Sequence, residues 1–362
     1  MERERNNIME LYKYPIGLTQ QFRHCGNPFR IDSYKGCGFG CKYCFANTEN
    51  FQSKNNFQLA DIEVIKRYFK KAFDEDKENK NITVELLRHK VPLHLGGMSD
   101  PFQPAENDFG ITYQILEICK KYNYPIIIST KTDNINRKYF ELIDKERVAF
   151  QCSLISINEK FIRNFEKRTA LPTSRIKFIK NLKDRDIWVS IRIQPLISLN
   201  EAKQVVNTLS GIVNYITVEH LKIATNDKTF REMFFTCSDY NIQDYVCTGK
   251  NYELKQDIKE NNIKELQYIS KCPIGVGDND LHYLSQSLNC CGVDTMPNAF
   301  QNYLKYNSMY IGITNDNTQW FPKCNCSSCF NSDCRKQGFT FKDYVDDFIQ
   351  NPKKNKNINI KI

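Results

Sequence analysis

The chain has 362 residues, of which 41% are hydrophobic, and it carries a formal net charge of +9. This length suffices for one large globular domain or two smaller ones, and no run of about 18 apolar residues predicts a transmembrane helix. The first residues lack the apolar core of a secretory signal, so the 15 cysteines indicate a reducing, cytoplasmic setting and metal binding rather than disulfides. The excess of lysine permits a polyanionic partner such as nucleic acid, although a solvated surface has the same composition.

Six apolar strands alternate with helices through the first two thirds of the chain. The strands that we expect cover residues 29–34, 91–95, 125–130, 148–155, 187–193 and 215–219. The helices that follow them cover residues 60–73, 113–122, 135–143, 174–182, 200–209 and 228–235. Such alternation predicts βαβ units and a parallel sheet that curls into a barrel. Six units rather than eight favour an α/β fold of the partial (β/α)6 barrel type.

The expected segments follow from where this alternation starts and stops. Residues 1–28 are a polar lead-in, and residues 29–236 carry the partial barrel. Residues 237–347 form an irregular cysteine-rich C-terminal cap, in which residues 275–280 have the composition of a turn-rich loop. Residues 348–362 are a flexible tail.

The most informative stretch is the glycine-rich loop after the first strand. Cys37, Cys41 and Cys44 have C-x3-C-x2-C spacing, and the interleaved glycines permit the tight turns that bring three sulfurs to one point. Thiolates select iron–sulfur clusters, zinc or Cu(I). A four-iron cluster normally takes four cysteines, so a loop that supplies three leaves one iron open for chemistry. The alternatives are a zinc knuckle, for which His24 and Cys25 lie upstream, or three unrelated thiols.

With Tyr43 directly before the third cysteine, the loop resembles the signature of the radical S-adenosylmethionine (SAM) enzymes. The resemblance implies a [4Fe-4S] cluster held by the three cysteines, with SAM chelated to the open iron. It further implies reductive cleavage of SAM to a 5′-deoxyadenosyl radical. An electron donor such as flavodoxin or ferredoxin and a partial barrel fold belong to the same expectation.

Polar groups follow the second and third strands, at the end where parallel barrels place their chemistry. Gly96 and Gly97 allow the backbone to approach a ligand, and Ser99 and Asp100 offer an acceptor and a carboxylate to an ammonium group. Lys131 can hold a carboxylate. The alternatives are a proline-closed turn and a surface lysine.

A narrower resemblance rests on three short matches. Ser99-Asp100, Thr130-Lys131 and the run from Ser156 through the Asn-Phe-Glu at 164–166 resemble the spore photoproduct lyase family, over about residues 29–220. The resemblance implies that the matching serines, aspartate and lysine line the SAM site. We therefore expect the cofactor to be bound by Tyr43, Gly96, Gly97, Ser99, Asp100, Lys131 and Ser156.

Two positions depart from the DNA-repairing members of that family. Gly97 stands where they carry a hydrogen-donating cysteine, and Phe45 stands where they carry a tyrosine. We therefore do not expect repair of thymine dimers. Nucleic acid remains the first substrate hypothesis, and a peptide or small metabolite is the alternative. Cys152 on the fourth strand is a candidate catalytic thiol, or else a small buried core residue.

Arg192 and Gln194 share one face of the fifth strand. If that face is the barrel interior, the Arg192 guanidinium can bind a carboxylate or phosphate, including one of the cofactor; otherwise it pairs with an acidic side chain. The five histidines form no metal pair or triad by spacing.

A second cysteine group lies near the C-terminus with C-x-C-x2-C-x4-C spacing, and consists of Cys324, Cys326, Cys329 and Cys334. It can bind structural zinc or a second iron–sulfur cluster, with Cys272, Cys290 and Cys291 as further candidate ligands. A non-enzyme hypothesis follows from the two groups together. Both would bind structural zinc in a nucleic-acid-binding protein.

Overall fold

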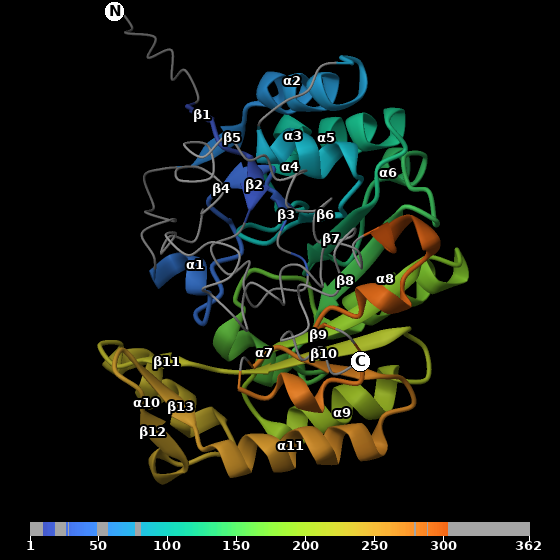
Figure 1. Ribbon diagram of the computed structural model, residues 1–362. Helices are drawn as coiled ribbons and strands as arrows, with labels where there is room; N and C mark the ends of the chain where they lie inside the picture. Colours follow the sequence, from blue (N-terminus) through green and yellow to red (C-terminus); the bar gives the residue numbers. More distant parts are fainter. Residues whose placement is uncertain are drawn as a thin grey trace, which may run out of the picture.

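The computed structural model describes residues 10–18, 27, 29–48, 57–76, 81–278, 280–287 and 289–302. Within this part, seven parallel strands form an open, curled sheet (Figure 1). In spatial order they are β3 (Phe29–Ile31), β6 (Leu93–Leu95), β7 (Ile126–Thr130), β8 (Val148–Ser153), β9 (Trp188–Leu196), β10 (Tyr215–His220) and β14 (Ile274–Val276). Antiparallel β2 (Ile16–Leu18) extends the edge at β3. The expected partial α/β barrel is confirmed.

Most helices in the described part of the chain cover the outer side of this sheet, whereas the helix at residues 228–237 lies beside the small sheet formed by residues 223–254 (Figure 1). The longer ones are α2 (Ile62–Phe73), α5 (Ile111–Lys121), α8 (Pro172–Asp184), α9 (Leu199–Leu209), α10 (Lys228–Cys237) and α11 (Gln256–Ile269). The shorter ones are α1 (Phe45–Thr48), α3 (Ile82–Arg88), α4 (Glu106–Phe109), α6 (Arg137–Phe140) and α7 (Glu159–Phe165). Helix α2 shows why these segments are helical. Asp61 caps its first turn by accepting hydrogen bonds from Glu63 N and Val64 N, and Ile65 and Phe69 recur at the helical period and are fully buried.

Two small sheets flank the main one. Strand β4 (Tyr34–Lys35) pairs with β5 (Gln58–Ala60), which also pairs with β1 (Leu11–Tyr12). The segment expected as one first strand is therefore divided between two sheets. Strands β11 (Ile223–Ala224), β12 (Tyr245–Cys247) and β13 (Asn251–Leu254) form the second small sheet.

The strand–helix alternation continues past residue 236, and the loop expected at residues 275–280 is wrong for its first two residues. Gly275 and Val276 belong to β14, which pairs in parallel with β10 after helix α11. A Cβ at Gly275 would lie 2.3 Å from Tyr215 Oη and 2.5 Å from the Cys290 carbonyl oxygen. Glycine is therefore required here by a close backbone approach inside a strand, and not by a turn.

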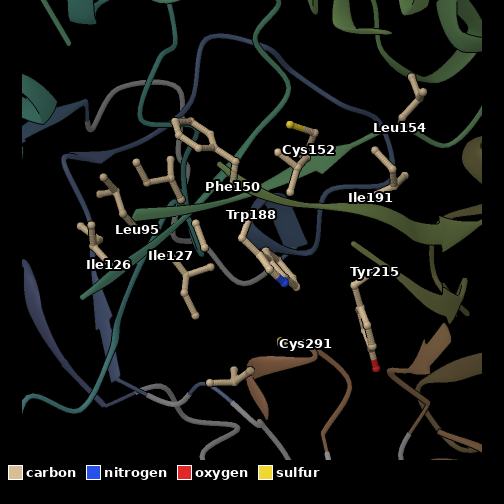
Figure 2. Packing of buried hydrophobic residues seen from close by; sticks show 14 of the residues in the cluster. Leu95, Ile126, Ile127, Phe150, Cys152, Leu154, Trp188, Ile191, Tyr215 and Cys291 are labelled. Atoms are coloured by element: carbon tan, nitrogen blue, oxygen red, sulfur yellow. The ribbon is translucent and has the colours of Figure 1, made fainter. Parts of the chain in front are cut away.

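The two faces of the sheet differ in what they contact. Phe150 of β8 packs edge-on against Phe178 of α8, with ring centroids 6.0 Å apart, and Figure 2 shows Cys152 on the same side of the strand. On the lumen side, Trp188 and Tyr215 are stacked, and Trp188 Nε1 donates to the Thr295 carbonyl at 3.1 Å. The segment around residues 289–300 thus packs against the N-terminal end of the lumen. None of the helices in the described ranges combines the length and the apolar character that crossing a bilayer requires.

Candidate metal and cofactor site

The cysteine loop lies between β4 and α1, and the buried side-chain amide of Gln103 holds its first turn. Gly38 N donates to Gln103 Oε1 at 2.7 Å, and Gln103 Nε2 donates to the Gly36 carbonyl at 3.0 Å. Gly36 and Gly40 have φ values of +93° and +61°, in the left-handed region that favours glycine. Gln103 therefore holds the turn geometry that the glycines permit.

The three thiols of the loop differ in exposure. Cys41 is buried, whereas Cys37 and Cys44 are partly exposed. Burial raises the pKa of Cys37 to about 11 and that of Cys41 to about 12. Among the residues that the structure describes, no three metal-ligating side chains are already gathered around one point. The fit to a cluster therefore rests on three soft donors in one glycine-rich loop, and bound iron would have to displace their protons.

The loop after β6 joins two strand ends through Asp100. Its Oδ1 accepts hydrogen bonds from Thr130 Oγ1 and Phe102 N, both at 2.9 Å, and its Oδ2 accepts one from Lys131 N at 2.6 Å. The carboxylate is buried, and burial raises its pKa. Ser99, also buried, donates to the Tyr34 carbonyl at 2.7 Å. Both side chains thus already hold the protein backbone, and Asp100 positions the start of the Lys131 segment.

The two glycines of this loop have different surroundings. Gly96 has a φ of +94°, and a Cβ there would lie 2.3 Å from the Ser129 carbonyl oxygen. Close packing against β7 therefore requires glycine at this position. At Gly97 the nearest atom to such a Cβ would be 3.6 Å away on the His94 ring, which is an ordinary contact.

Glu166, the residue after α7, is the buried centre of the site. Tyr43 Oη donates to Oε1, Arg175 Nη2 donates to Oε2, and Thr169 Oγ1 donates to Oε2 at 3.0 Å. Lys131 Nζ lies 3.7 Å from Oε1 and 5.6 Å from the centroid of the Tyr43 ring. Burial alone would raise the pKa of Glu166, but the Arg175 guanidinium and the Lys131 ammonium lower it to about 2. The carboxylate is therefore ionised and joins the cysteine loop to β7 and α8.

Ser156 lies in a separate pair. Its side chain is fully buried, its hydroxyl donates to Glu201 on α9, and it accepts a hydrogen bond from Asn158 N at 2.8 Å. Within the described residues, its hydrogen bonds go to Glu201 and Asn158 and not to Asp100 or Lys131. The structure therefore brings Tyr43 and Lys131 together, whereas Ser156 is held by a different helix.

Arg192 lies on the lumen face, as the strand alternation allowed. Its Nη1 donates to Ser129 Oγ at 3.0 Å and to Gln151 Oε1 at 3.2 Å, and its Nε donates to Gln194 Oε1 at 2.7 Å. These acceptors are neutral, so the alternative in which Arg192 forms an ion pair is not observed among the described residues. His94 donates to or accepts from the same Ser129 hydroxyl at 2.7 Å, and burial together with Arg192 lowers its pKa to about 3.

Cys152 is placed among apolar neighbours. It is 3% exposed, faces the same way as Phe150, and has a pKa raised to about 12 by burial. These are the surroundings of a core thiol. Cys290 and Cys291 have their sulfurs 3.6 Å apart. Cys324, Cys326, Cys329, Cys334, His24 and Cys25 lie outside the described residues.

Sequence reasoning missed three residues that organise the site. They are Gln103, Glu201 and Glu166, and each acts through a partner at least 45 positions away. Glu166 belongs to the Asn-Phe-Glu match, but it was not assigned a role. Glu166 directly follows α7, which already begins with the acidic Glu159, so no local pattern sets it apart.

Comparisons with known proteins match the part of the chain that contains this site. A family model described as the radical SAM superfamily matches residues 31–209. An uncharacterized protein of Methanocaldococcus jannaschii is 25% identical over 260 residues, which cover 70% of this chain and 91% of that protein. An uncharacterized protein of Mycobacterium tuberculosis is 23% identical over 199 residues, which cover 52% of this chain and 53% of that protein. The match thus spans about half of the mycobacterial relative.

Two solved structures were found to be similar to this chain. A spore photoproduct lyase variant superposes with a TM-score of 0.51 and 13% sequence identity, covering 74% of this chain and 81% of that one. Streptococcus suis SuiB bound to S-adenosylmethionine has a TM-score of 0.45 and 14% identity, covering 68% of this chain and 49% of that one. At this level of identity, the likeness to the lyase variant concerns the fold alone.

Proposed function

The chain belongs to the radical SAM superfamily of enzymes, and we propose that its cysteine loop holds a [4Fe-4S] cluster that cleaves SAM for hydrogen-atom abstraction from a substrate. Membership of the family implies the cluster and SAM. The observation that carries the proposal is the juxtaposition of Tyr43, inside the C-x3-C-x2-C loop, with Lys131 at the end of β7. This places the thiol donors beside a cation at the C-terminal end of the parallel strands, where such barrels carry their chemistry.

In this proposal Cys37, Cys41 and Cys44 bind three irons and leave the fourth for the amino and carboxylate groups of SAM. When bound, the cluster and SAM together supply one-electron reductive cleavage and hydrogen-atom abstraction. The Lys131 side chain is only 15% exposed, and its ammonium group would bind the SAM carboxylate. Asp100 keeps Lys131 at this position by accepting its backbone N–H.

The other residues proposed to contact the cofactor already form hydrogen bonds within the protein. The Ser99 hydroxyl donates its hydrogen to the Tyr34 carbonyl, so its oxygen can accept a hydrogen bond from a donor group of SAM. Ser156, in the loop after β8, and Arg192 of β9 would contact the cofactor or the substrate. The buried side chains of Ser129 and Gln151 hold the Arg192 guanidinium on the lumen face.

We propose nucleic acid as the first substrate class, on the net charge of +9 and the motif likeness to the spore photoproduct lyase family. A peptide or a small metabolite is the alternative. A salt-dependent shift of DNA or RNA in gel electrophoresis supports the first class, and its absence at low salt favours the second. A further metal, zinc or iron–sulfur, bound by the four C-terminal cysteines belongs to the same proposal.

Cluster assembly tests the proposal before any substrate is known. Anaerobic reconstitution with iron and sulfide should give a brown protein that absorbs near ~400 nm. Cys41→Ala should lose this cluster, whereas Cys119→Ala, a buried cysteine on α5, should keep it. A colourless wild-type protein that carries zinc alone would favour the nucleic-acid-binding alternative and contradict the proposal.

A further inference from the structure

Four different parts of the chain meet at one buried carboxylate. Glu166 is fully buried and is approached by Tyr43 of the cysteine loop, by Lys131 directly after β7 and by Arg175 of α8. Thr169 comes from the loop between α7 and α8. The backbone adds a further link, because Lys42 N donates to the Phe165 carbonyl at 2.9 Å. The residue between Cys41 and Tyr43 is thus bonded to the residue before Glu166.

The two cations at this carboxylate are held differently. Arg175 is 1% exposed and is fixed by Glu166 together with the Ala170 and Ser153 carbonyls, at 2.9 Å and 3.0 Å. Its charge is therefore matched by that of Glu166. Lys131 Nζ, at 3.7 Å, is within ion-pair range of Glu166 but beyond hydrogen-bond range. Lys131 is thus a second, loosely held cation over the Tyr43 ring.

The nearby acid Asp100 does not neutralise this arrangement in the same way. It binds the backbone N–H of Lys131 and the Thr130 hydroxyl, and no ion pair joins it to the Lys131 ammonium within the described residues. The charges nearest to Cys41 are Lys131, Arg175 and Glu166, whereas Asp100 faces the loop at Cys37, to which its backbone N–H donates. A change at Glu166 or Lys131 alters this local charge by one unit in opposite directions.

We infer that Glu166 is a positioning residue that sets the local charge at the cysteine loop, by orienting Tyr43 and restraining Lys131, and so sets the reduction potential of the cluster bound there. The inference rests on the proposed function. Reduction adds one negative charge to the cluster, so an added local positive charge favours the reduced form. Removing the Glu166 charge should raise the potential, and removing the Lys131 charge should lower it.

Redox titration of the reconstituted full-length protein, followed by electron paramagnetic resonance and absorbance, tests this sign. Glu166→Gln should increase the ratio of reduced to oxidised cluster at a fixed applied potential by about tenfold, or about 59 mV for a one-electron couple. Lys131→Met should decrease the ratio by a similar factor. Glu117→Gln, an exposed residue on α5 with the same charge change, should leave it unchanged.

The outcomes distinguish failure of this inference from failure of the proposed function. Opposite shifts in Glu166→Gln and Lys131→Met, at full iron content, support the inference, and unchanged or same-sign shifts overturn it. If Glu166→Gln does not retain iron, the Lys131→Met potential decides alone, because that variant keeps the Glu166–Arg175 pair. A wild-type protein that assembles no cluster overturns the proposed function itself, and this inference with it.

Discussion

Tyr43 of the cysteine loop donates its phenolic hydrogen to the buried carboxylate of Glu166, which lies 123 positions later in the chain. This bond fixes the loop that carries the candidate cluster ligands to the end of α7. Arg175 and Lys131 converge on the same carboxylate. The candidate site is therefore organised around an ionised acid that no metal or cofactor is expected to contact.

The Glu166 charge should make stability depend on pH in the acid range. Its folded pKa of about 2 lies below the ordinary value of 4.5, so its stabilisation is present above pH 4.5 and is lost as the pH falls toward 2. By linkage the carboxylate contributes about 3 kcal/mol at neutral pH, as an order of magnitude. Urea unfolding of the metal-free, reduced protein should show Glu166→Gln less stable at pH 7, with the deficit shrinking between pH 4.5 and 2. A deficit that does not change with pH would contradict this assignment.

Asp100 should be required for the geometry of the β7 end. Asp100→Ala leaves Thr130 Oγ1 and Lys131 N without their acceptor, which should lower the free energy of unfolding by about 2–4 kcal/mol. Because Lys131 then loses its fixed position, SAM affinity measured by equilibrium dialysis on the cluster-loaded protein should also fall. Asp108→Ala, at an exposed position in α4, is the control and should change neither quantity. Unchanged stability of Asp100→Ala would show that these hydrogen bonds do not form.

Gly275→Ala tests the seventh strand. Its Cβ would lie 2.3 Å from Tyr215 Oη and 2.5 Å from the Cys290 carbonyl, so β14 or the segment beyond it must move. The cost should be about 1–3 kcal/mol in the free energy of unfolding. Gly17→Ala, in β2 with no atom within 4 Å of the new Cβ, should cost far less. Equal effects of the two substitutions would argue against the placement of β14 beside β10.

The strands of the barrel could be predicted because long apolar runs mark them. Residues 126–128 are continuously apolar and fully buried, as the middle of a covered parallel sheet requires. Strand β14 was missed because it is three residues long, follows Pro273 and contains a glycine. The prediction of a turn at Gly275 was wrong because the glycine is required by the close approach of the Tyr215 side chain. Tyr215 lies 60 positions earlier in the chain, so no local pattern indicates this contact.

The candidate site could be predicted in part for a similar reason. The spacing of Cys37, Cys41 and Cys44 is local, so the loop could be identified from the sequence alone. The bonds that Asp100 and Glu166 make are long-range, so the sequence indicated polar groups near the strand ends without showing which ones are already bonded to the protein. Asp100, expected from the sequence to accept a hydrogen bond from the SAM ammonium, accepts hydrogen bonds from Lys131 N and Thr130 Oγ1 in the structure.

Reductive cleavage of SAM tests the central claim most directly. The reconstituted protein, incubated anaerobically with SAM and a strong one-electron reductant, should release 5′-deoxyadenosine and methionine. Cys41→Ala should release neither above background, and Cys119→Ala should match the wild type. A wild-type protein that holds a full iron complement and yet forms no 5′-deoxyadenosine, or a Cys41→Ala variant as active as the wild type, would contradict the account.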